Sequence, residues 1–192
     1  IDTAEMYAIP SAPKTQGKSE EIIGSWLKNK QRDKVVLATK ITGPNPAYSH
    51  IREPQPFTKE LLLNTVELNL KRLQTDYIDV YQLHWPDRNV NFFGNLNYKH
   101  KANEQWEDRI GEIVGAMDTL VKQGKIRHYG LSNETPWGTM RHINEADKQS
   151  VSRFKTIQNP YSLLSRSLEI GLSEMMMREK VGLLAYSPLG FG

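Results

Sequence analysis

The stretch Ile1-Asp2-Thr3-Ala4-Glu5-Met6-Tyr7 decides how the rest of the chain is interpreted. It places an acid and a tyrosine five positions apart, across what the pattern indicates is the end of a strand and its loop. Two apolar runs further along also end in a polar side chain, one in Lys40 and the other in His84. In a parallel α/β barrel the carboxyl ends of all strands open onto one face, where the active site lies. The sequence therefore predicts that Asp2, Tyr7, Lys40 and His84 share one pocket.

Helical patterns recur between the apolar runs. Apolar residues at helical spacing predict helices over residues 18–30, 61–73, 110–121 and 169–180. Ser19 and Thr58 are expected to cap the first two, and Pro136 to begin a further helix.

Short apolar runs predict the strands of the fold. These runs occupy residues 35–39, 77–83, 128–132, 156–158 and 181–186. Their alternation with helices favours a parallel sheet in an α/β fold.

Composition narrows the classes of protein and partner. A length of 192 residues suits one domain with a substantial core. The net charge is only +3, and lysines and arginines are dispersed among acids, so nucleic acid is not an expected partner. The chain has no cysteine and its histidines lack metal-ligand spacing, so no metal site is expected. No apolar run approaches the roughly 18 residues that a membrane helix needs, so no membrane partner is expected and a cytoplasmic location is the default. The oligomeric state stays open.

Five short motifs occur in a characteristic order along the chain. They are Asp2–Tyr7, Leu37–Lys40, Gln82–Pro86, Gly130–Asn133 and Ala185–Gly190. In this order they resemble the motifs of the aldo-keto reductase family, in its Tas-like bacterial branch. The resemblance implies an α/β fold of the (β/α)8 TIM-barrel type that binds NADP(H). The strand ends match the second to seventh strands of that barrel, so residues 1–192 are expected to form one truncated barrel domain of a longer parent chain.

The resemblance also implies how the four side chains in the predicted pocket act. Tyr7 is expected to give its proton to a carbonyl oxygen while hydride reaches the carbonyl carbon. Lys40, held by Asp2, is expected to lower the pKa of the Tyr7 hydroxyl, and His84 to orient the carbonyl oxygen. Structural interpretations also exist: a loop aromatic for Tyr7, a solvated strand end for Lys40, and a core histidine satisfied by backbone for His84.

The resemblance assigns the cofactor to the ends of three later strands. A polar set there is expected to bond the nicotinamide carboxamide, although Ser-Asn pairs also suit turns and helix caps. An aromatic ring is expected to stack on the nicotinamide, and backbone N–H groups after it to reach the pyrophosphate. In chain order the expected contacts are Ser132, Asn133, Gln158, Tyr186, Ser187, Pro188, Leu189 and Gly190. The choice of NADP over NAD rests on the resemblance alone.

Substrate choice is assigned to Trp85 and the long loop after it. The resemblance places Trp85 in the substrate wall, and the alternative is an aromatic that fills the barrel rim. The implied function is NADPH-dependent reduction of a small aldehyde or ketone. Two alternatives stay open: a cofactor-binding regulatory protein resembling the β-subunits of potassium channels, and a remnant that neither closes a barrel nor binds cofactor.

Overall fold

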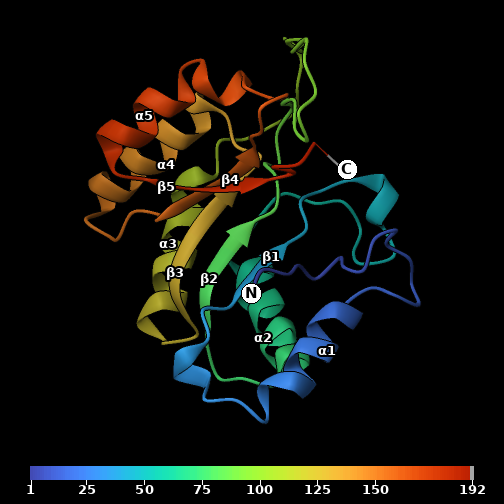
Figure 1. Cartoon of the computed structure of the whole chain (residues 1–192). Coiled ribbons are helices and arrows are strands. Elements are labelled where there is room, and N and C mark those ends of the chain that lie inside the picture. The colour runs from blue at the N-terminus through green and yellow to red at the C-terminus, as the bar shows by residue number, and fades with distance from the viewer. Residues whose placement is uncertain (191–192) are drawn as a thin grey trace.

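The computed structural model describes residues 1–190 and arranges them around one parallel sheet (Figure 1). The strands lie side by side in chain order, and each pairs in parallel with the next. They are β1 (Ala38–Ile41), β2 (Ile78–Leu83), β3 (Ile126–Ser132), β4 (Thr156–Pro160) and β5 (Gly182–Tyr186). One α-helix lies between each strand and the next along the chain, as in part of a (β/α)8 barrel, the predicted fold class.

The helices pack beside one another in the same order as the strands. They are α1 (Lys18–Leu27), α2 (Lys59–Leu73), α3 (Ile110–Lys122), α4 (Pro136–Gln149) and α5 (Leu172–Glu179). Helix α1 packs on α2, α2 on α3 and α3 on α4. Among residues 1–190, no helix combines the length and the apolar character needed to cross a membrane.

Helix α2 illustrates how the core forms between the helices and the sheet. As predicted, Thr58 caps this helix, because its hydroxyl accepts a hydrogen bond of 3.2 Å from the Leu61 N–H. The predicted apolar stripe is confirmed at the four apolar residues that the helix buries, Leu62, Val66, Leu70 and Leu73.

Helix α1 differs from its prediction in both cap and buried face. It follows Gly17, which has φ 76°, and no described side chain caps it, so the predicted cap at Ser19 is wrong. Ile22 and Trp26 are exposed. The side facing α2 carries Gly24, where an added Cβ would lie 2.4 Å from a backbone oxygen of α2. The two helices therefore approach closely at Gly24, and of the predicted apolar residues of α1 only Leu27 is buried, with Ile23 partly buried against the core.

Strand β1 begins at Ala38, three residues later than predicted. Val36 is 66 % exposed, and the Leu37 N–H donates to the Asp79 carboxylate (2.9 Å) instead of to a neighbouring strand. The side-chain acceptor therefore delays the strand ladder by satisfying this N–H.

The first residues run along the free edge of β1. Ala38 exchanges backbone hydrogen bonds with Ile1 and Thr3 (2.8 and 2.9 Å), which form a parallel bridge centred on Asp2. This bridge lies at the amino end of β1, and the Glu5 N–H, which donates to the Lys40 carbonyl oxygen (3.2 Å), holds the stretch further along the strand.

Candidate active site

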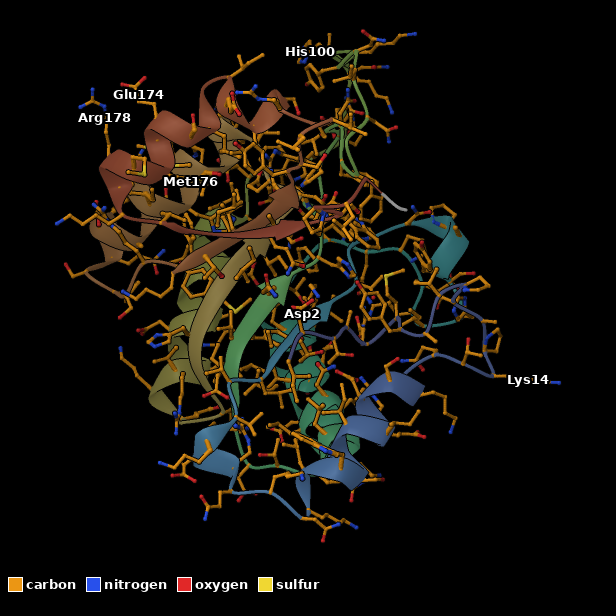
Figure 2. All side chains as sticks on the ribbon, viewed as in Figure 1. Asp2, Lys14, His100, Glu174, Met176 and Arg178 are labelled. Carbon is orange, nitrogen blue, oxygen red and sulfur yellow. The ribbon has the colours of Figure 1, made fainter. Side chains whose placement is uncertain are left out.

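A pocket of about 440 Å³ opens at the carboxyl ends of the strands. Three of the four predicted catalytic side chains and five of the predicted cofactor residues line it. The side chains that line it are Asp2, Met6, Tyr7, Ile9, Tyr48, His84, Phe93, Ser132, Asn133, Gln158, Tyr186 and Ser187. Figure 2 shows Asp2 near the centre of the molecule, beside β1.

Lys40 lies beneath this pocket and is fully buried. Its Nζ donates to Asp2 Oδ2 (2.6 Å) and to the Thr3 carbonyl oxygen (2.8 Å). The same Nζ lies 5.4 Å from the centroid of the Tyr7 ring. Burial lowers the pKa of Lys40, and the Asp2 carboxylate opposes that shift. The interpretation of Lys40 as a solvated strand end is therefore wrong.

Gln82, the first residue of the Gln82–Pro86 motif, is a part of the site for which no role was expected. Its Nε2 donates to Asp2 Oδ1 (3.2 Å), so that Asp2 is held from both carboxylate oxygens. Gln82 stands opposite Lys40 in the parallel register of β1 and β2, which directs both side chains to the same face. The sequence held a usable signal, because residues two apart on a strand share a face and Gln82 stands two before His84.

Tyr7 lies partly buried beside His84, with ring centroids 5.9 Å apart in an edge-on arrangement. Burial raises the pKa of Tyr7, and the Asp2 carboxylate raises it further. This direction contradicts the expectation of a lowered pKa. Desolvation of the partly buried ring disfavours the phenolate, and the nearby Asp2 carboxylate repels it.

His84 is buried and neutral. Burial first, and the Lys40 ammonium second, hold its pKa well below the usual value of 6.5. Its Nδ1 has no hydrogen-bond partner among residues 1–190, so the interpretation of a histidine satisfied by backbone fails for that atom. A neutral imidazole beside Tyr7 can donate or accept one hydrogen bond at each nitrogen, according to its tautomer.

The polar residues that are expected to bind the cofactor form hydrogen bonds with one another across the ends of β3, β4 and β5. Ser132 Oγ donates to the Gln158 carbonyl oxygen (2.9 Å). Asn133 Nδ2 donates to the His84 carbonyl oxygen (2.9 Å), and Asn133 Oδ1 accepts from the Tyr186 hydroxyl (2.7 Å). The cap of α4 is Thr135, so the Ser-Asn pair is not the helix cap.

The segment after Tyr186 leaves the pocket after its first residue, Ser187. Ser187 lines the pocket with φ 53°, and the Gly190 N–H donates to its carbonyl oxygen (2.9 Å). Pro188 and Leu189 are exposed and do not line the pocket. The assignment of this turn to a pyrophosphate stays a prediction.

Trp85 lies behind the pocket wall and not in it. It is fully buried, its ring is parallel to that of Phe92 at 5.6 Å, and it is absent from the pocket lining. A Cβ at Gly43 would lie 2.3 Å from the Trp85 ring, so only glycine allows this packing. The aromatic rings that do line the pocket on this side are Phe93, from the loop expected to set substrate choice, and Tyr48, for which no role was expected.

A protein-family model described as the aldo/keto reductase family matches residues 1–192. The chain belongs to the aldo/keto reductase family. It is 46 % identical over 200 residues to protein tas of Escherichia coli strain K12, matching all of this chain and 56 % of that protein. It is 41 % identical over 170 residues to an aldo-keto reductase of Babesia bovis, matching 83 % of this chain and 59 % of that protein. The chain thus spans a little over half the length of these curated relatives.

Two solved structures share this aldo/keto reductase fold. An aldo-keto reductase from Klebsiella pneumoniae in complex with NADPH superposes with a TM-score of 0.71 at 32 % identity. An aldo/keto reductase from the same organism, in complex with NADP and acetate, gives 0.69 at 30 % identity. Each structure matches 99 % of this chain. The match spans 52 % of the chain in the NADPH complex and 53 % of the chain in the complex with NADP and acetate.

Proposed function

We propose that this chain carries the catalytic site of an NADPH-dependent reductase that converts aldehydes or ketones to alcohols. One observation carries the proposal: a fully buried lysine, paired at 2.6 Å with Asp2, lies under the ring of Tyr7. A neutral His84 completes the same pocket. Together these groups offer a proton donor, a fixed positive charge and a second hydrogen-bonding group around one small volume.

The cofactor side of the pocket suits a nicotinamide. Ser132, Asn133 and Gln158 bring hydroxyl and amide groups to the ends of adjacent strands, and these can meet both the donor and the acceptor of a carboxamide. Tyr186 lines the same pocket and presents an aromatic face. NADPH, when bound, supplies the hydride. NADP and NADPH in the two Klebsiella pneumoniae structures support this choice.

Each remaining residue has a role that follows from its protonation state. The raised pKa keeps Tyr7 protonated at neutral pH, so it can donate to an oxygen that gains negative charge. The buried Lys40 ammonium stabilises that charge through the low-dielectric interior. His84, being neutral, holds the carbonyl oxygen without competing for the proton.

Cofactor binding and turnover test this function together. We expect the purified full chain to quench NADPH fluorescence on binding, and to oxidise NADPH when aldehydes are added from a panel of aromatic and aliphatic compounds. Binding without turnover across the panel would favour the regulatory alternative, and absence of binding would exclude the proposed function.

The pH profile of reduction follows from the two shifted groups. The pKa of Tyr7 lies above 10.0 and that of His84 well below 6.5, so both stay in their active forms between these values. We expect kcat/KM to show no acid limb near pH 6.5 and to fall only on the alkaline side, as Lys40 and Tyr7 lose protons. An acid limb near pH 6.5 would show that the charge state of His84 is assigned wrongly.

Substrate choice is expected to depend on the loop at residues 86–107, and on Phe93 in particular. Phe93→Ala should lower kcat/KM for aromatic aldehydes about 10-fold relative to small aliphatic ones, because a ring contact is lost. The backbone N–H at position 93, which donates to Asn133 Oδ1 (3.2 Å), is not removed by this substitution. NADPH affinity should therefore stay nearly unchanged. Leu96→Ala, in the same loop but outside the pocket, is the control. A change in cofactor affinity alone would count against this assignment.

A further inference from the structure

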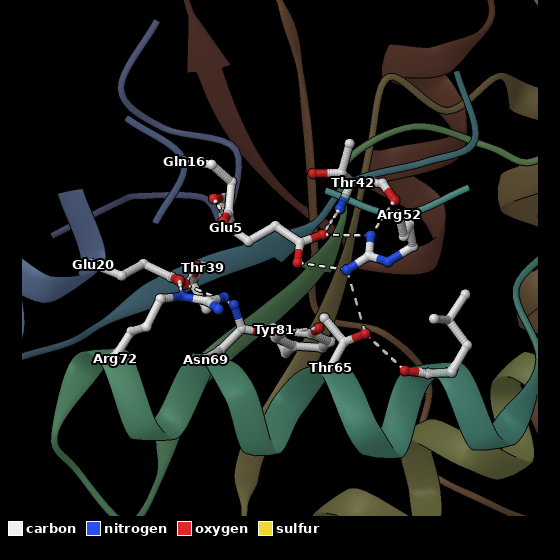
Figure 3. A network of polar contacts seen from close by, with 11 residues as sticks. Glu5, Gln16, Glu20, Thr39, Thr42, Arg52, Thr65, Asn69, Arg72 and Tyr81 are labelled. Atoms are coloured by element: carbon white, nitrogen blue, oxygen red, sulfur yellow. Dashed lines mark hydrogen bonds and ion pairs between the residues drawn. The ribbon is translucent and has the colours of Figure 1, made fainter. Parts of the chain in front are cut away.

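The carboxylate of Glu5 is the most completely bonded group in the stretch between Asp2 and Tyr7. Its side chain is 2 % exposed. Oε1 accepts from the Thr42 N–H (2.5 Å) and from one Arg52 nitrogen (2.7 Å), and Oε2 accepts from the other (2.6 Å). Figure 3 shows the carboxylate and the guanidinium facing each other in this forked arrangement.

The backbone of Glu5 is held as firmly as its side chain. Its N–H donates to the Lys40 carbonyl oxygen (3.2 Å). Its carbonyl oxygen accepts from the Gly17 N–H (2.9 Å) and from Gln16 Nε2 (3.1 Å). Tyr7 follows two residues later, and its N–H donates to the Ala4 carbonyl oxygen (3.0 Å). Glu5 is therefore held in place by its backbone and its side chain, two residues before Tyr7.

Arg52 connects Glu5 to elements outside the stretch. It comes from the loop after β1, donates to the Thr42 carbonyl oxygen (3.2 Å), and reaches the Thr65 hydroxyl of α2 at 3.5 Å. That hydroxyl in turn donates to the Leu61 carbonyl oxygen (2.8 Å), and Figure 3 shows the whole connection above α2. The pair thus ties the stretch to the end of β1 and to a helix of the core.

We infer that the Glu5–Arg52 ion pair is a positioning device that sets the Tyr7 hydroxyl over Lys40 by fixing the turn that carries it. Neither side chain lines the pocket, so the pair acts through Tyr7 and not on the substrate. The inference rests on the proposed function for its kinetic consequence. Reacting groups tolerate little displacement, and a misplacement of about 1 Å can cost 10²-fold in rate.

The ion pair at Asp79 provides a matched control on the opposite end of the sheet. Asp79 Oδ2 accepts from a guanidinium nitrogen of Arg32 (2.8 Å) and from the Leu37 N–H (2.9 Å), and its side chain is 9 % exposed. Asp79→Asn therefore removes the same kind of buried charge beside the amino end of β1, whereas Glu5 lies beside its carboxyl end. Glu20 is a poorer control, because its carboxylate accepts from Thr39, the neighbour of Lys40.

The test compares Glu5→Gln, Arg52→Met and Asp79→Asn in the full chain. Glu5→Gln and Arg52→Met should each lower kcat about 10- to 100-fold, with NADPH affinity within about twofold of wild type. Asp79→Asn should lower the melting temperature comparably and leave kcat within about twofold. In a Tyr7→Phe background, Glu5→Gln should produce no further loss, because the group it positions is gone. Equal kcat losses in Glu5→Gln and Asp79→Asn, or an additive loss in the Tyr7→Phe background, would overturn the inference.

A spectroscopic readout keeps the inference testable apart from turnover. With fluorotyrosine in place of tyrosine, the fluorine resonance of residue 7 should broaden or split in Glu5→Gln and stay as in wild type in Asp79→Asn. If wild type shows no turnover, the proposed function fails and this resonance alone decides whether the pair positions Tyr7. An unchanged resonance in Glu5→Gln would overturn the inference.

Discussion

Replacing Tyr7 with phenylalanine is expected to lower the rate of carbonyl reduction by about 10²- to 10⁴-fold, the usual contribution of a general acid. The raised pKa of Tyr7 means that its proton is present at neutral pH. Among the described residues, Tyr7 is the only tyrosine whose ring packs edge-on against the His84 ring. NADPH affinity should change little, because the proposed cofactor groups lie on β3, β4 and β5. Steady-state kinetics and fluorescence titration on the same preparation measure both quantities.

Tyr129→Phe is the control for this variant. Tyr129 is a buried tyrosine of β3 that packs against Phe154, with ring centroids 6.2 Å apart, and it does not line the pocket. Its replacement removes a hydroxyl from the same sheet and should leave kcat close to wild type. Near-wild-type turnover in Tyr7→Phe would remove Tyr7 from its proposed role.

Replacing Lys40 with methionine is expected to lower the rate of carbonyl reduction while the chain stays folded. Reduction should slow by about 10²- to 10³-fold, because a preorganised charge beside the developing oxyanion is lost. The fold should survive, since an apolar residue of similar size relieves the cost of burying an ammonium. Asp2, with 41 % of its side chain exposed, remains solvated without its partner. Kinetics and thermal melting measure the two effects.

Asp2→Asn is the informative comparison for the Lys40 variant. It leaves the buried ammonium without the carboxylate that raises its pKa, so Lys40 should lose its proton at lower pH. The alkaline limb of the kcat profile should therefore move to lower pH in Asp2→Asn. A Lys40→Met variant that keeps its rate, or an unmoved alkaline limb in Asp2→Asn, would contradict the proposed role of this pair.

The strand ends could be predicted because their signals are local. Apolar runs that finish at Lys40 and His84 indicate buried parallel strands, and barrel geometry then brings the ends together. The place of Gln82 in the site could have been predicted in the same way. Side chains of a strand alternate between faces, so Gln82 and His84 lie on the same face.

Other features of the site depend on contacts that the sequence does not encode locally. Glu5 and Arg52 are 47 residues apart, and nothing in their spacing indicates a forked pair. The direction of the Tyr7 pKa shift depends on how deeply the ring is buried and on the nearby Asp2 carboxylate. Trp85 stands next to His84 in sequence but points to the opposite side of the wall, a placement fixed by packing against Gly43 and Phe92.

The transfer of labelled hydride tests the central claim most directly. The full chain would be mixed with an aldehyde and with NADPH that carries deuterium at both hydrogens of the nicotinamide C4, and the alcohol would be examined by mass spectrometry. The proposed function predicts one deuterium on the carbinol carbon for each NADPH consumed, in wild type and in Tyr129→Phe, and only a trace of labelled product in Tyr7→Phe over the same time. Bound cofactor with no labelled alcohol from wild type, or equal labelling in wild type and Tyr7→Phe, would contradict it.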